Sequence, residues 1–131
     1  MARLDHVNIQ TTKLAETVAF YADVIGLEVR DPPELDPTLV QWMYDEGGKA
    51  ILHLSTVGSL LGEDGMELGE DTGAVHHVAL DCAGHDAMVA KLDRMGLAYR
   101  LNHVKTIDLK QIFVHDPNGV LLELNYFKAR Q

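Results

Sequence analysis

The sequence predicts an α+β fold that is built from two tandem βαβββ modules. The chain repeats itself, each copy alternates between strand-like and helix-like hydrophobic patterns, and 131 residues suit one ordinary domain. The repeat is visible in three separated segments, at shifts of 70 or 71 residues: Leu4–Ile9 with Val75–Leu80, Ile25–Leu27 with Met95–Leu97, and Ala50–Leu54 with Val120–Leu124.

Each half predicts one strand, then a helix, then three further strands. Alternation with period two marks the first strands, Leu4–Gln10 and Val75–Asp81. Apolar stripes with helical spacing follow, formed by Leu14, Val18, Tyr21 and Ile25 in one half and by Met88, Leu92 and Met95 in the other. Thr12 is the expected N-cap of the first helix, and Gly26 and Gly96 are expected to end the two helices. The other strands are expected over 28–30, 39–44, 50–55, 99–102, 111–115 and 120–126.

The module boundaries follow from composition. We expect module 1 at about 1–57 and module 2 at about 74–131, within a single domain of 1–131. The stretch 58–73 is acidic and carries regularly spaced glycines, so it is expected to be a linker.

Charge and composition exclude several classes of function. The chain carries 20 acidic residues against 11 Lys and Arg, for a net charge of −9, which disfavours nucleic acid and anionic membranes as partners. No apolar run approaches the roughly 20 residues of a membrane span, and the start of the chain has no signal pattern. The single cysteine, Cys82, excludes a disulfide framework and is expected to be an inert buried thiol. We therefore expect a cytoplasmic protein that acts on a small molecule.

Four metal-capable side chains occupy equivalent positions in the two halves. On each strand the aliphatic neighbours share one face, so His6, His77, His53 and Glu123 are expected on the opposite, helix-free face. Imidazole and carboxylate are the usual ligands of zinc, iron, manganese and nickel. If the two sheets pair, these four donors converge on one divalent ion.

Other residues are candidates for contact with substrate. Asn8 and Asn125 share faces with His6 and Glu123, where each could orient a ligand or contact substrate. Trp42 is expected to face the core, which would leave Gln41 and Met43 to line the pocket. His103 is expected in a polar loop over the site, whereas His85 is expected to be exposed.

Four segments resemble the vicinal oxygen chelate superfamily, which contains glyoxalase I, fosfomycin-resistance transferases, methylmalonyl-CoA epimerase, extradiol dioxygenases and bleomycin-resistance proteins. They are LDHVNI, AFYADVIGLEV, VHHVAL and FVHDPNGVLLELNYF. The resemblance implies an open, incomplete mixed β-barrel around one divalent metal ion. It places ligands at His6, His77 and Glu123, and it places His53 where glyoxalase I has a Glu. The stretch MELG is also similar to glyoxalase I.

The resemblance implies a divalent-metal-dependent glyoxalase-like enzyme of lyase or isomerase type. The ion (Fe, Zn, Ni or Mn) would chelate neighbouring oxygens of a small substrate and stabilise an enolate or enediolate, and His53 or Glu123 would move the proton. His53 is thus a ligand, a base or part of the pocket lining.

Two main alternatives remain open. One is an extradiol-type dioxygenase with Fe(II), and the other is a non-catalytic protein that sequesters a drug, as in bleomycin resistance. Epimerisation of an acyl-CoA is also open, although few basic residues are available for the CoA phosphates. We expect a homodimer, whose metal cup is formed within one chain or between two.

Overall fold

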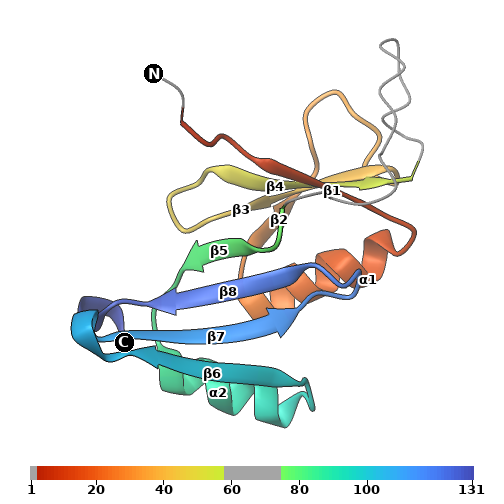
Figure 1. Cartoon of the computed structure of the whole chain (residues 1–131). Coiled ribbons are helices and arrows are strands. Elements are labelled where there is room, and N and C mark those ends of the chain that lie inside the picture. Colours follow the sequence, from red (N-terminus) through yellow and green to blue (C-terminus); the bar gives the residue numbers. More distant parts are fainter. Residues whose placement is uncertain (1–2, 58–74) are drawn as a thin grey trace. The chain divides into compact units, whose positions relative to one another are not determined.

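Each half of the chain forms a four-stranded mixed sheet and a helix, as the internal repeat predicts (Figure 1). The computed structural model describes residues 3–57 and 75–131. The chain divides into two units, residues 1–71 and 72–131. The predicted linker 58–73 and the MELG stretch lie outside the described residues.

Unit 1 has the element order of a βαβββ module. Its strands are β1 (Val7–Thr11), β2 (Glu28–Arg30), β3 (Val40–Tyr44) and β4 (Ala50–Thr56). Between β1 and β2 lies α1 (Leu14–Ala19), which continues as a π-helical segment, η1 (Phe20–Ile25). The sheet order is β1-β4-β3-β2, in which β1 and β4 are parallel and the other pairs are antiparallel.

Unit 2 repeats this arrangement. It contains β5 (Val78–Asp81), α2 (His85–Arg94), β6 (Tyr99–Val104), β7 (Leu109–His115) and β8 (Leu121–Tyr126), with short 3₁₀ turns η2 (Lys105–Ile107) and η3 (Lys128–Arg130). The sheet order is β5-β8-β7-β6, and only β5 and β8 are parallel. The predicted architecture of two open βαβββ sheets is therefore confirmed.

The strand registers bear out the duplication residue by residue. In unit 1 the parallel pair aligns Asn8 with His53, and in unit 2 it aligns Ala79 with Glu123. The aliphatic residues beside these two donors are buried on the opposite face: Leu52, Leu54, Leu122 and Leu124. Period-two alternation thus places His53 and Glu123 away from the aliphatic face, as expected.

The first helix differs from its prediction in two respects. It begins at Leu14 after Lys13, and no side chain caps it, so the expected N-cap at Thr12 is wrong. Instead, the hydroxyl of Thr17 donates to the Lys13 carbonyl (2.8 Å). The buried face also differs from the predicted stripe, because Leu14, Val18 and Ile25 are only partly buried. That face consists of Thr17, Phe20, Tyr21 and Val24.

Both helices end near the expected glycines. Gly26 and Gly96 have φ angles of 90° and 66°, in the left-handed region that glycine adopts without steric cost. The described residues include no helix that is long and apolar enough to cross a membrane.

The polar loop expected at 103–110 is strand at both ends. β6 continues to Val104 and β7 begins at Leu109, so the connection shortens to the turn around η2 and Asp108. Asp108 has a φ of 45° and closes that turn. His103 therefore lies in β6 rather than in a loop, and the earlier expectation is wrong.

Candidate functional site

Unit 1 brings three aromatic rings together on the face that His53 occupies. The His6 ring stacks on the His53 ring, with centroids 3.7 Å apart and planes 15° apart. The Trp42 indole stacks on His53 as well, at 4.2 Å and 8°. The antiparallel register explains the second contact, because Trp42 and His53 are direct cross-strand partners. His53 is thus stacked on two rings, His6 and Trp42.

His6 has one ring nitrogen committed to a neighbouring carboxylate. Its Nδ1 lies 2.7 Å from Oδ2 of Asp5, so Nδ1 carries the proton and donates to the carboxylate. In the neutral ring, Nε2 is then the nitrogen that can bind an ion. A carboxylate on the remote nitrogen is the usual arrangement for a metal-binding histidine, since it fixes the tautomer and the ring orientation.

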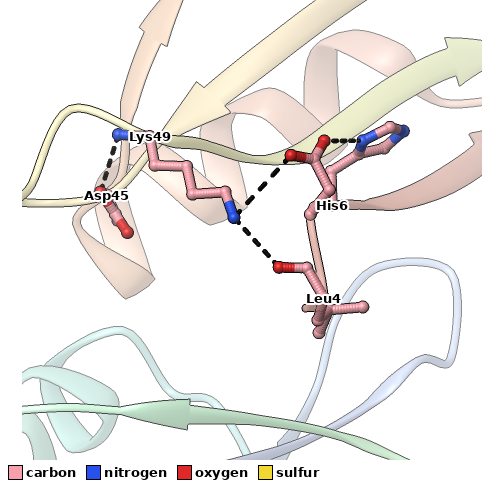
Figure 2. Close-up of polar contacts among 5 residues, drawn as sticks. Leu4, His6, Asp45 and Lys49 are labelled. Carbon is pink, nitrogen blue, oxygen red and sulfur yellow. Dashed lines mark hydrogen bonds and ion pairs between the residues drawn. The ribbon is translucent and has the colours of Figure 1, made fainter. Parts of the chain in front are cut away.

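Lys49 ties the segment before β1 to the turn between β3 and β4 (Figure 2). Its Nζ donates to the carbonyl oxygen of Leu4 (3.0 Å) and lies 3.9 Å from Oδ1 of Asp5. Its backbone N–H donates to the carboxylate of Asp45 (2.9 Å). The Asp5–Lys49 pair is exposed, so its own energy is small. The contacts of Lys49 therefore join two segments of unit 1, and the placement of Asp5 at His6 rests on their own 2.7 Å contact.

The pKa of His53 is lowered from its ordinary value. Burial is the main cause because it penalises the charged form, and the nearby His6 lowers the pKa further. His53 is therefore a neutral imidazole near pH 7. A neutral ring can accept a proton or bind a metal ion.

Unit 2 places its two candidate metal ligands, His77 and Glu123, next to each other. Nε2 of His77 lies 3.9 Å from Oε1 of Glu123. Nδ1 of His77 lies 3.0 Å from Nδ1 of His76, so that nitrogen is engaged and Nε2 faces the carboxylate. Oε2 of Glu123 accepts a hydrogen bond from Nδ2 of Asn125 (3.0 Å). Asn125 therefore contacts a candidate ligand, one of the two roles considered for it.

Asn8 lies beside His53 in the parallel register of unit 1. Its Oδ1 accepts a hydrogen bond from the hydroxyl of Ser55 (3.1 Å). The register places Asn8 on the face that His53 occupies, and Asn8 stays a predicted contact for substrate.

Two predicted pocket residues lie on the wrong face of their strand. Met43 is fully buried and pairs with Leu52, on the aliphatic side of the sheet. Gln41 shares that side, and its amide donates to Oδ1 of Asp31 (3.0 Å) and to the carbonyl of Pro37 (2.8 Å). The prediction failed because β3 carries apolar residues on both faces, so alternation did not distinguish them. Trp42 lies on the face that was assigned to Gln41 and Met43.

Two further histidines are placed differently from expectation. His103 is aligned with Lys110, on the opposite face from Asn102, and its Nε2 lies 2.8 Å from Oδ1 of Asp108. His85, expected to be exposed, is 9% exposed and packs edge-on against Tyr126. The structure therefore brings neither ring to the donor pairs. Cys82, expected to be a buried thiol, is partly buried, and this burial raises the pKa of the thiol to about 11.

The site also contains residues that the sequence reading missed. Asp5 directly precedes His6, and that adjacency was the available signal. Gln111 and Asn102 join Asn125 through cross-strand hydrogen bonds. Strand register alone creates those contacts, so no local pattern in the sequence revealed them.

Within each unit, the candidate ligands meet only part of the geometry that a divalent ion requires. An ion lies about 2.1 Å from a His nitrogen or a carboxylate oxygen, so His77 and Glu123 are close enough to share one. His6 and His53 are not both aimed at one point, because an ion lies in the plane of each ring that binds it and these planes are nearly parallel. Across residues 3–57 and 75–131, no three His, Cys, Asp or Glu side chains are grouped as a metal site. Each unit by itself supplies two donors.

Comparisons with known proteins agree with this architecture. The solved structure of a protein described as glyoxalase family, from Bacillus anthracis, has a TM-score of 0.72 at 21% identity and covers 98% of this chain and 97% of its own. A fosfomycin resistance protein from Listeria monocytogenes has a TM-score of 0.69 at 17% identity and covers 98% and 94%. A glyoxalase/dioxygenase from Nostoc punctiforme has a TM-score of 0.68 at 21% identity and covers 94% and 89%. These likenesses establish the fold.

Sequence comparison establishes the family. The Arabidopsis thaliana protein named Glyoxylase I 4 is 26% identical in an alignment of length 130 that covers 95% of this chain and 70% of the relative. The family model of the Glyoxalase/Bleomycin resistance protein/Dioxygenase superfamily matches residues 3–124. The resemblance first noted in the strand motifs is thereby confirmed, and the chain belongs to the Glyoxalase/Bleomycin resistance protein/Dioxygenase superfamily.

Proposed function

We propose that this protein is a divalent-metal-dependent, glyoxalase-like enzyme of lyase or isomerase type that acts on a small substrate with two neighbouring oxygens. One observation carries the proposal: the duplicated units place metal-capable pairs, His6 with His53 and His77 with Glu123, at equivalent positions. Superfamily membership supports it. The ion is Fe, Zn, Ni or Mn, because imidazole and carboxylate donors suit all four.

His6, His77 and Glu123 are the proposed ligands. Asp5 orients His6 with Nε2 free, and the His77–Glu123 separation suits donors that draw together on a shared ion. The bound ion would supply Lewis-acid stabilisation of negative charge on substrate oxygens. Asn8 and Asn125, on the donor faces, would contact substrate or orient ligands.

Proton transfer is assigned to His53. The lowered pKa of His53 keeps its ring neutral and able to accept a proton. Because the His53 ring is stacked on the rings of His6 and Trp42, His53 and His6 cannot both direct a ring nitrogen at the same ion. A residue that stays bound to the ion cannot also act as a free base. Glu123 and His53 therefore have separate roles in this proposal, ligand and base.

The stacking of His53 also favours a second candidate, an extradiol-type dioxygenase that uses Fe(II). Without His53, the donor set is two histidines and one carboxylate, which is the facial triad of non-haem iron enzymes. Anaerobic iron loading and oxygen uptake with catechols test this candidate. No uptake across a broad panel of catechols would exclude it.

Elemental analysis of protein purified without a histidine tag tests the metal site. The variants are His6→Ala and Glu123→Ala, and His103→Ala is the matched control because the His103 side chain lies on the opposite face of its sheet from Asn102 and contacts Asp108. We expect near one ion per site in wild type and control, and loss of the ion in both site variants. Iron directs the assays to catechols, whereas nickel, zinc or manganese directs them to hemithioacetals and other enolisable substrates. No binding after loading with each ion would refute the enzyme and favour a drug-sequestering protein.

We also infer a homodimer, because each four-stranded sheet leaves two edge strands that a second chain can cover. Light scattering should give twice the chain mass of 14.5 kDa. Mixing His6→Ala with Glu123→Ala chains then shows whether a cup is shared. A shared cup restores metal binding at about a quarter of the sites after random exchange, and a cup within one chain restores none.

A further inference from the structure

We propose that a row of three carboxamides, Asn102, Gln111 and Asn125, positions the Glu123 carboxylate. The proposal rests on the proposed function of Glu123 as a metal ligand. Nδ2 of Asn102 donates to Oε1 of Gln111 (2.7 Å), and Nε2 of Gln111 donates to Oδ1 of Asn125 (3.0 Å). Nδ2 of Asn125 donates to Oε2 of Glu123 (3.0 Å). The row therefore ends on the candidate ligand.

Strand register builds this row. Gln111 on β7 is the direct partner of Asn102 on β6 and of Asn125 on β8. Asn125 follows Glu123 by two residues, so both side chains lie on one face of β8. Gln111 is only 8% exposed, which makes its two hydrogen bonds costly to lose. The buried centre of the row thus constrains both of its ends.

The row has a fixed direction, and Glu123 sets it. An ionised carboxylate only accepts hydrogen bonds, so Asn125 must present its amino group to it. The oxygen of Asn125 then faces Gln111, which must donate, and the oxygen of Gln111 faces Asn102 in turn. All three carboxamides therefore point their NH₂ groups toward Glu123. A hydrogen bond to a charged acceptor is stronger than one to a neutral acceptor.

The row leaves Glu123 one oxygen for a metal ion. Oε2 is engaged by Asn125, whereas Oε1 faces Nε2 of His77 at 3.9 Å. Oε1 is therefore the Glu123 oxygen that would be offered to an ion shared with His77. The described residues of unit 1 do not repeat this row, because Val40 pairs with Ser55 where Gln111 pairs with Asn125. The carboxamide row is thus a feature of unit 2.

Calorimetric titration of the metal-free full chain with Zn²⁺ tests the proposal. We expect Asn125→Leu to weaken binding by about 10- to 100-fold and Gln111→Leu by about 10-fold, the usual range for partners of metal ligands. Gln111→Glu is the sharpest variant, because it keeps the shape but cannot donate to Asn125. It should bind Zn²⁺ no better than Gln111→Leu, although it adds a negative charge.

Lys110→Met is the matched control. Lys110 neighbours Gln111 on β7, but its side chain lies on the opposite face, so the Kd should stay within about twofold of wild type. If the buried variants fail to fold, Asn102→Leu at the exposed end of the row replaces them, with an expected weakening of about 2- to 5-fold. Wild-type affinity in a folded Asn125→Leu chain, or in Asn102→Leu if that chain does not fold, would overturn the proposal.

Side-chain amide NMR of the metal-free protein separates this proposal from the proposed function. Glu123→Ala should shift the Asn125 amide signals strongly, those of Gln111 less and those of Asn102 least. Wild-type chain that binds no metal would refute the proposed function, yet the graded shifts would still establish that the row holds the carboxylate. An Asn125 signal that ignores Glu123→Ala would overturn the row itself, whatever the chain binds.

Discussion

The indole of Trp42 lies parallel to the imidazole of His53, with ring centroids 4.2 Å apart and planes 8° apart. The two residues are cross-strand partners on β3 and β4. Trp42 is the single tryptophan of the chain. Because its ring stacks on His53, its fluorescence reports on the protonation of that imidazole.

Trp42 fluorescence should fall as the pH drops through the pKa of His53, because a protonated imidazole quenches a stacked indole. Burial and the neighbouring His6 lower that pKa, so the midpoint should lie below the ordinary value of 6.5. The folded state favours the neutral ring. The stability it contributes is therefore present above 6.5 and is lost as the pH falls through the folded pKa.

A fluorescence titration over about pH 4 to 8, the range in which histidines titrate, measures this midpoint. The control is His53→Gln, whose profile should be flat over this range. A wild-type midpoint at or above 6.5 would contradict the assigned environment of His53.

Asp5→Ala should weaken metal binding at His6 because the ring loses the carboxylate that fixes its tautomer. Since Asp5 is 79% exposed, we expect the lower end of the usual effect, about 10-fold. Competition with a chelator measures the affinity. Lys49→Met is the control and should change the affinity by less than about twofold, because its ion pair with Asp5 is exposed. Equal affinities for wild type and Asp5→Ala would show that Asp5 does not orient His6.

Met43→Ala should destabilise the fold by about 2–5 kcal/mol, since it removes a fully buried side chain and leaves a cavity. Urea unfolding measures the loss. Gln41→Ala, the neighbouring change, removes two hydrogen bonds at a less buried position and should cost about 1 kcal/mol. A small effect of Met43→Ala would restore Met43 as a residue of the pocket.

Cys82 should react slowly with iodoacetamide in the folded protein. Burial raises its pKa to about 11, so little thiolate is present at pH 8 and the rate should rise steeply toward that value. The same chain in urea is the control, and its thiol should react more than about 100-fold faster at pH 8. Comparable rates in the two conditions would mean that the thiol is accessible and not buried.

The strands and their order along the chain were largely predictable, because hydrophobic periodicity and internal repetition can be read directly from the sequence. Strand β2 matches its prediction, and several others differ by one or two residues at an end. The first strands start later than expected, at Val7 and Val78, because pairing with β4 and β8 begins only there. His6 and His77 therefore precede their strands.

The candidate donors were predictable for the same reason, and their partners were not. Alternation placed His53 and Glu123 opposite the aliphatic side chains, which the burial of Leu54 and Leu124 confirms. It could not place Trp42, because both faces of β3 are apolar and only the pairing with His53 decides the face.

The sequence by itself determined the duplicated βαβββ modules and the superfamily, and it singled out the four candidate metal ligands, since each depends on residue types at fixed spacings. The tertiary structure alone decided which side chains touch those donors. Trp42 on His53 and the carboxamide row on Glu123 arise from cross-strand pairing. Such pairing joins residues that are distant in the chain, and a one-residue change of register would exchange the faces they occupy.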